Sequence, residues 1–116
     1  MGAKVHSRTR TAGLALILLA GCSDGGPRTP EEELVRRGRA AYQTDCVVCH
    51  NPDPREPGAV GPALAGSSLE LLRAKVLHNA YPPGYTPKRD TQAMIPLVHR
   101  EPDLPALEAY LASFPR

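Results

Sequence analysis

Cys46, Cys49 and His50 are the residues of this sequence whose types and spacing carry the most specific chemistry. Two cysteines three positions apart, with a histidine directly after the second, are the pattern required for covalent haem attachment. In a helical segment these positions (i, i+3, i+4) project from one face. Both thiols then reach the two vinyl groups of one porphyrin, while the imidazole reaches the iron from the same side. We therefore expect one covalently bound haem c.

Two other uses of cysteine pairs fit this sequence less well. A thioredoxin-like redox pair requires a preceding strand in a βαβ unit, and no alternating strand pattern is found in the sequence. A zinc site requires four well-spread ligands, usually in two separated pairs. Here three candidate ligands crowd into five residues, and the sequence has no second C-x-x-C motif.

The sixth coordination position of the iron decides between electron transfer, which needs a filled site, and ligand binding or catalysis, which need a vacant one. The only methionines are Met1, which is lost with the expected signal peptide, and Met94. A lone methionine is more often core filler. However, Met94 lies 44 residues after His50 in a proline-flanked loop, so it can return over the opposite face of the haem. We expect His50 and Met94 to be the metal ligands.

Three other side chains remain alternatives for the sixth position. His78 and His99 would give a chemically ordinary bis-histidine site, although a solvent-facing histidine is the commoner role for each. Lys75 is a weaker candidate, because an exposed helical lysine is the default.

A short apolar segment near the start predicts export. Residues 14–20 (LALILLA) are too few to cross a bilayer, and they follow a basic stretch that holds Lys4, Arg8 and Arg10. Residues 19–22 (LAGC) then match the bacterial lipobox, in which cleavage precedes a cysteine that receives lipid. An ordinary signal peptide with a cysteine at its cleavage site is the alternative.

This interpretation divides the chain into three parts. We expect a lipoprotein-type signal peptide at residues 1–21, a flexible linker at 22–29 anchored by lipid on Cys22, and a haem domain at 30–116. It also accounts for all three cysteines, since two attach haem and one carries lipid. The expected location is the periplasmic side of a bacterial membrane.

The composition agrees with one small domain built around a cofactor. The chain has 116 residues, no Trp, one Phe and four Tyr, so its own side chains form a thin core that a porphyrin would fill. Residues 1–21 hold three basic and no acidic residues, which leaves 11 basic against 12 acidic residues in the rest of the chain. Nothing in this balance indicates a nucleic acid partner.

The pattern of caps and apolar positions predicts an all-α fold with three main helices. The first begins at Thr29-Pro30 with a capping box from Thr29 to Glu32, and it extends to about Asp45. The second covers residues 67–79, opened by a capping box from Ser67 to Glu70. Asp103 can cap the last helix. Gly38 in the middle of the first helix predicts close approach by another backbone, which we expect to be that of the last helix. Long proline-rich loops at 51–66 and 80–97 complete the domain.

Over roughly residues 31–115 the chain resembles the class I monohaem cytochromes c. The matching pieces are Gly38 and Tyr42, the motif at 46–50, Gly61-Pro62-Ala63-Leu64, Met94, and the segment Leu107–Leu111. The resemblance implies that the first and last helices cross at the glycine and the aromatics. It also implies that the Pro62 carbonyl orients His50 and that Leu64 packs on the porphyrin. One departure is that Pro96 follows Met94 by two positions, where the family often has proline directly after the ligand.

The expected function is one-electron transfer by a His/Met-ligated haem c, with redox proteins as partners and no catalysis of its own. A cytochrome subunit of a membrane-associated dehydrogenase or oxidase complex is the main alternative. A ligand-binding haem sensor requires Met94 to be absent from the iron. A peroxidase-like enzyme requires a vacant site with acid–base groups beside it, and the sequence shows no such constellation.

Overall fold

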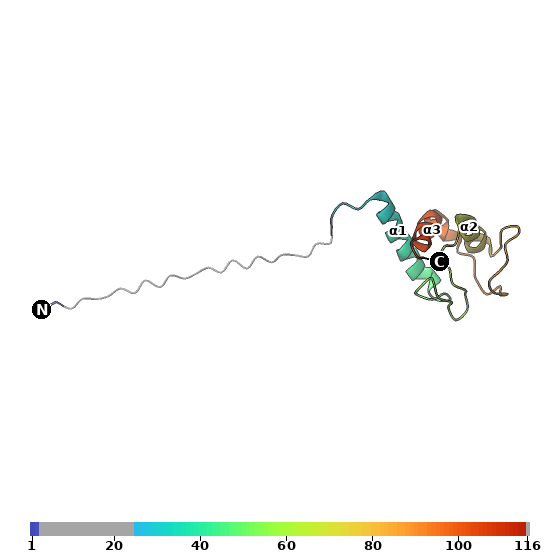
Figure 1. Ribbon diagram of the computed structural model, residues 1–116, viewed down its shortest axis with the longest axis horizontal. Coiled ribbons are helices and arrows are strands. Elements are labelled where there is room, and N and C mark those ends of the chain that lie inside the picture. The colour runs from blue at the N-terminus through green and yellow to red at the C-terminus, as the bar shows by residue number, and fades with distance from the viewer. Residues whose placement is uncertain (3–24, 116) are drawn as a thin grey trace.

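The computed structural model describes residues 1–2 and 25–115. Within these ranges it contains three α-helices and no β-strand (Figure 1). Residues 3–21 of the expected signal peptide and the lipidation site at Cys22 lie outside the described residues. Two shorter helical segments accompany the α-helices, so that the elements in chain order are α1 (Pro30–Ala41), the π-helix η1 (Tyr42–Cys46), α2 (Leu69–His78), the 3₁₀-helix η2 (Val98–Asp103) and α3 (Leu104–Ala112). None of the described helices is long and apolar enough to cross a membrane.

Helix α1 begins at the predicted capping box. The Glu32 amide donates to Thr29 Oγ1 at 3.2 Å, and the Thr29 amide donates to Glu32 Oε2 at 2.7 Å. Pro30 occupies the first turn, where its missing N–H is not needed. The predicted start of this helix is confirmed.

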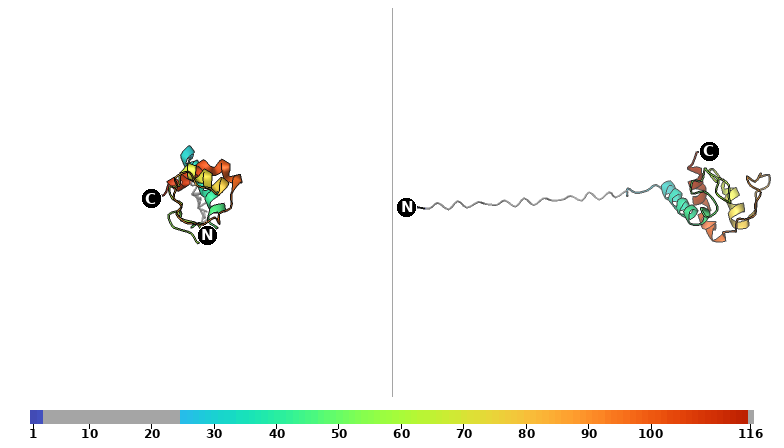
Figure 2. Two further views of the ribbon diagram at one scale, coloured as in Figure 1. Left: turned by 90° about the vertical axis from the view of Figure 1, so that its right-hand side faces the viewer. Right: turned by 90° about the horizontal axis from the view of Figure 1, so that it is seen from below.

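Helices α1 and α3 pack across each other, as Figures 1 and 2 show from different sides. Gly38 lies at their contact. A Cβ atom on Gly38 would overlap the carbonyl oxygen of Ala106 and lie 2.8 Å from Tyr110 Cβ. One turn later Tyr42 is fully buried, and its ring centroid lies 5.5 Å from that of Tyr110. The predicted close approach of the last helix to Gly38 is therefore confirmed.

The helix continues beyond α1 to Cys46, but its hydrogen-bond pattern changes from α to π. We expected one regular helix to about Asp45, whereas Tyr42–Cys46 form a π turn in which the Val47 amide donates to Tyr42 O at 3.3 Å. The Thr44 hydroxyl also donates back to Ala40 O at 2.8 Å. A π turn holds one residue more than an α turn, and such turns are frequent at functional sites.

The start of α2 differs from the prediction. Ser68, rather than Ser67, is the N-cap, and its hydroxyl accepts from the Leu71 amide at 3.2 Å. The Ser67 hydroxyl instead donates to Leu64 O at 2.7 Å. A second free amide, that of Leu69, donates to the Glu108 carboxylate at 2.9 Å. The Ser67 amide, which we expected to be bonded by Glu70, donates to Leu64 O at 3.0 Å, and the bond from Leu69 to Glu108 joins α2 to α3.

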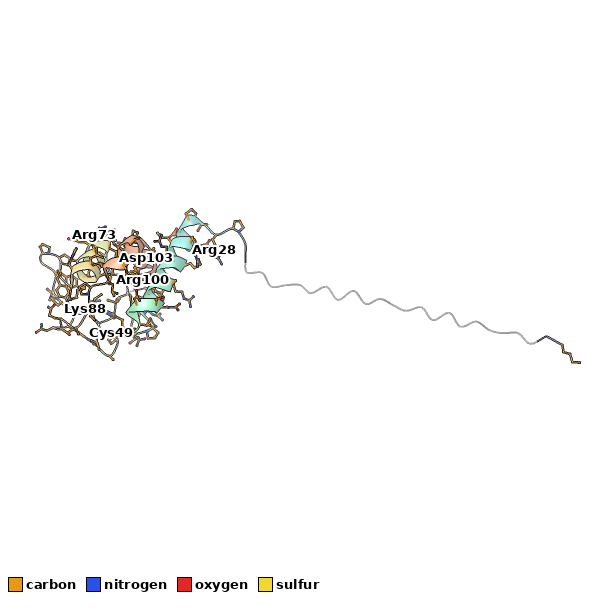
Figure 3. The ribbon with its side chains drawn as sticks, turned by 180° about the vertical axis from the view of Figure 1, so that it is seen from behind. Arg28, Cys49, Arg73, Lys88, Arg100 and Asp103 are labelled. Carbon is orange, nitrogen blue, oxygen red and sulfur yellow. The ribbon has the colours of Figure 1, made fainter. Side chains whose placement is uncertain are left out.

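Asp103 occupies the N-cap position of α3 as expected, but its side chain makes no capping hydrogen bond. Its carboxylate accepts from Arg37 Nε at 2.7 Å and from Arg100 Nη1 at 3.0 Å, and Figure 3 labels Arg100 and Asp103 side by side in this cluster. Arg100 Nε also donates to Asp45 Oδ2 at 2.5 Å. The side-chain hydrogen bonds from Arg100 and His99 lower the pKa of Asp45 below its usual value. Two carboxylates and two guanidinium groups therefore join α1 and η1 to the start of α3.

Replacement of Gly38 by valine should destabilise the protein by about 3 kcal/mol, because the added side chain would force α1 and α3 apart. Denaturant unfolding measures this free energy directly. An Arg39→Ala change on the exposed side of α1 serves as the control and should shift it by less than about 0.5 kcal/mol. Equal effects of the two changes would contradict the proposed backbone contact.

Candidate functional site

An apolar cavity of about 280 Å³ lies between the helices and the two long loops. Every haem-site residue predicted within the described part of the chain lines it, namely Cys46, Cys49, His50, Pro62, Leu64 and Met94. Leu72, Val76, Leu107 and Leu111 of α2 and α3 supply part of its inner wall. The sequence-predicted candidates are thus brought together in one place.

The cysteine motif forms a single helical turn at the edge of this cavity. The amides of Cys49 and His50 both donate to Cys46 O, at 3.2 and 2.9 Å. Both cysteines are half-buried and not joined by a disulfide. The predicted arrangement, in which both thiols and the imidazole face one space, agrees with the lining of the cavity.

A glycine-containing turn packs directly against this motif. The Gly61 amide donates to Cys49 O at 2.9 Å. A Cβ atom on Gly58 would lie 2.6 Å from His50 Cα, and one on Gly61 would lie 2.7 Å from His50 Nε2. Only glycine at these two positions leaves room for the backbone and the ring of His50.

The imidazole of His50 is oriented by the backbone of Pro62. Its Nδ1 donates a hydrogen bond to Pro62 O at 2.8 Å, the contact that the family resemblance implied. Burial lowers the pKa of His50, against the opposing effect of this hydrogen bond, and the positive charge of Arg89 lowers it further. The ring is therefore neutral at pH 7, with Nδ1 protonated and Nε2 carrying the lone pair that a metal ligand needs.

Met94 lies in the loop 80–97, which has no helix or strand. Its side chain is half-buried and packs against the buried cluster formed by the helices. The Leu97 amide, three residues later, donates to Val76 O of α2 at 2.6 Å. Met94 thus approaches the cavity from a different segment of the chain than His50.

The rival ligands are distributed differently. His78 is exposed at the end of α2, and His99 is exposed with its Nε2 3.0 Å from Asp45 Oδ2, so both are solvent-facing as expected and neither lines the cavity. Lys75 differs from the expectation, because it is half-buried and lines the cavity. Its ammonium group donates to Asn79 Oδ1 at 2.6 Å and lies 4.2 Å from the centroid of the Tyr81 ring.

Several lining residues were missed by the sequence analysis. The rings of Tyr81 and Tyr85 stack at 5.4 Å with an interplanar angle of 8°. Lys88 Nζ donates to Ala63 O at 2.8 Å, which joins the two long loops, and Figure 3 labels Lys88 together with Cys49. These residues lie in a proline-rich segment without periodicity. The presence there of two of the four tyrosines was the only available signal.

The donor set and the lining fit a covalently attached haem. Burial, together with the charge of Asp45, raises the pKa of the Cys46 thiol to about 11, so that at neutral pH it is a neutral S–H facing an apolar space. A neutral imidazole and a thioether are both suitable haem iron ligands. The described residues contain no group of three or more His, Cys, Asp or Glu side chains that could hold a metal ion.

A Gly61→Ala change should displace the His50 ring and break its hydrogen bond to Pro62. We expect a loss of about 1–3 kcal/mol in unfolding free energy, as for other overpacked sites. A lower yield of haem-bearing protein, measured as the ratio of haem to polypeptide absorbance, should accompany it. Gly26→Ala, where the added carbon meets no atom within 4 Å, is the control. Unchanged stability and haem content in Gly61→Ala would contradict the packing described here.

Comparison of the chain with protein-family models, with curated proteins and with solved structures finds no match.

Proposed function

We propose that this protein is an electron carrier built on one haem c, attached through Cys46 and Cys49 and ligated by His50 and Met94. One observation carries the proposal. The predicted attachment and ligand groups, which come from two separated segments of the chain, line one apolar cavity, and His50 is held there by Pro62 of a third segment. The resemblance of the sequence to class I cytochromes c supports the same reading.

The side chains suit electron transfer rather than catalysis. When bound, the haem iron would supply one-electron chemistry by alternating between the Fe(II) and Fe(III) states. His50 and Met94 offer neutral donor atoms, and the Pro62 carbonyl fixes the orientation of the imidazole and strengthens it as a donor. Around a bound haem, the apolar part of the wall would disfavour the extra positive charge of the ferric state and so would raise the reduction potential.

Partners would meet the protein at the mouth of the cavity. Val48 and Ile95 both line the cavity and are 80% and 75% exposed, which leaves apolar contact area around the opening. A redox protein is the class of partner that this arrangement favours. Lipid on Cys22, if attached as the lipobox predicts, would keep the domain at the periplasmic side of a membrane, with residues 23–29 as the spacer.

The first test is the intact mass of the protein, purified from cells that mature c-type cytochromes. We expect the polypeptide mass plus that of one haem, retained under denaturing conditions because the bonds are covalent. A Cys46→Ala, Cys49→Ala double variant should lose this added mass. A bare polypeptide from the unchanged sequence would exclude the proposed function.

The second test concerns Met94. In a Met94→Ala variant the ferric protein should lose the sulfur-to-iron absorption band, and the ferrous protein should gain carbon monoxide binding, because the sixth position becomes vacant. Changes at the exposed neighbour Ile95 (Ile95→Ala) and at the rival ligands (His78→Ala, His99→Ala) should leave both spectra unchanged. Loss of the native spectrum in either histidine variant, with Met94→Ala unaffected, would assign the ligand to that histidine.

A further inference from the structure

The segment that carries Met94 has little regular structure of its own, so its position must be set by what holds it. Two hydrogen bonds bracket Met94 within the described residues. The backbone carbonyl of Gln92, two positions before it, accepts from Asn79 Nδ2 at 3.2 Å. The Leu97 amide, three positions after it, donates to Val76 O at 2.6 Å. Both partners, Asn79 and Val76, belong to the C-terminal end of α2.

Asn79 has an unusual backbone for a residue with a side chain. Its φ and ψ of 49° and 36° place it in the left-handed region, and in the described part of the chain it is the only residue other than glycine with positive φ. The backbone N–H of Asn79 donates to Lys75 O at 3.0 Å and thereby caps α2. Glycine is the usual residue at such a helix end, and asparagine is the main substitute. Asparagine therefore satisfies the backbone and adds an amide group that glycine lacks.

Lys75 fixes the orientation of that amide. The Lys75 ammonium donates to Asn79 Oδ1 at 2.6 Å, so the NH₂ end of the side chain is left for the Gln92 carbonyl. The ammonium is itself held 4.2 Å from the Tyr81 ring, which stacks on Tyr85. Hydrogen bonds to a charged donor are stronger than neutral ones, so this contact defines one rotamer of Asn79.

We propose that Asn79 is a positioning residue which, oriented by Lys75, holds the Gln92 backbone and thereby keeps Met94 at its coordination position. This inference rests on the proposed function, in which Met94 is an iron ligand. A thioether is a soft and neutral ligand, so its retention on ferric iron depends on how firmly the loop presents it. The Asn79–Gln92 contact is one of the two bonds that present it, and it is the one that a side-chain substitution removes.

The test uses imidazole as a probe that competes with Met94 for ferric iron in the haem-bearing protein. An Asn79→Gly change keeps the left-handed backbone and removes only the side chain. We expect imidazole to bind Asn79→Gly about fivefold more tightly than wild type, which corresponds to about 1 kcal/mol, the contribution of one hydrogen bond. The sulfur-to-iron band should disappear at correspondingly lower imidazole concentrations.

Two further variants separate positioning from stability. Gln92→Ala is the matched control, because Asn79 binds the backbone carbonyl of Gln92 and not its side chain, so the imidazole affinity should equal that of wild type. Asn79→Asp preserves the size of the side chain and the contact with Lys75 but cannot donate to the carbonyl. It should therefore weaken the retention of Met94 in the same direction as Asn79→Gly, even if Asn79→Gly folds poorly.

The outcomes distinguish this inference from the proposed function. Wild-type imidazole affinity in both Asn79→Gly and Asn79→Asp would overturn the positioning role while leaving Met94 as the ligand. A wild-type protein that lacks the sulfur-to-iron band would overturn the assignment of Met94 itself.

Discussion

The contact between α1 and α3 at Gly38 is the constraint on which the other elements depend. Because Gly38 has no side chain, the backbone of Ala106 lies directly against α1, and the two helices pack more closely than any larger residue would permit. That distance buries Tyr42 and brings its ring to Tyr110. The Tyr42 hydroxyl in turn donates to Asn51 O at 2.6 Å, so the crossing also fixes the chain directly after the cysteine motif.

The site above this crossing is organised mainly by backbone atoms. His50 is bounded by the turn at Gly58 and Gly61 and oriented by the carbonyl of Pro62, so its direction does not depend on the rotamer of another side chain. The cavity wall on the other side is made by α2 and α3. The two proposed ligands are thus held in different ways, His50 by the backbone turn packed against it and Met94 by two hydrogen bonds from its loop to the end of α2. The proposed electron carrier would owe its stability to the first and its potential partly to the second.

How much could be predicted from sequence depended on the range of each interaction. Gly38, the capping box at Thr29 and the motif residues 46–50 have local signals, and the structure places them as expected. Ser68 and Asp103 show the opposite case. In the first turn of α2 the Leu69 amide is bonded by Glu108, which lies 39 residues away, and no capping bond is made by Glu70. The Asp103 carboxylate binds two arginines and makes no hydrogen bond to its own helix. These hydrogen-bond partners are close in space but distant in sequence, so local sequence patterns do not identify them. The Lys75–Asn79 pair was missed for the same reason, since its role depends on a loop that passes over α2.

The π turn between Tyr42 and Cys46 bears on how this sequence can change over evolutionary time. A turn of this kind corresponds to one residue inserted into an α-helix, and the surplus residue is absorbed before Cys46. Deletion of any residue from this segment would regularise the helix and rotate everything after it, turning the first thiol away from its wall of the cavity. The proline-rich loops can vary in length without such a rotation. Gaps and insertions among descendants of this chain should therefore accumulate in those loops, while the five-residue segment keeps its length even where its side chains are exchanged.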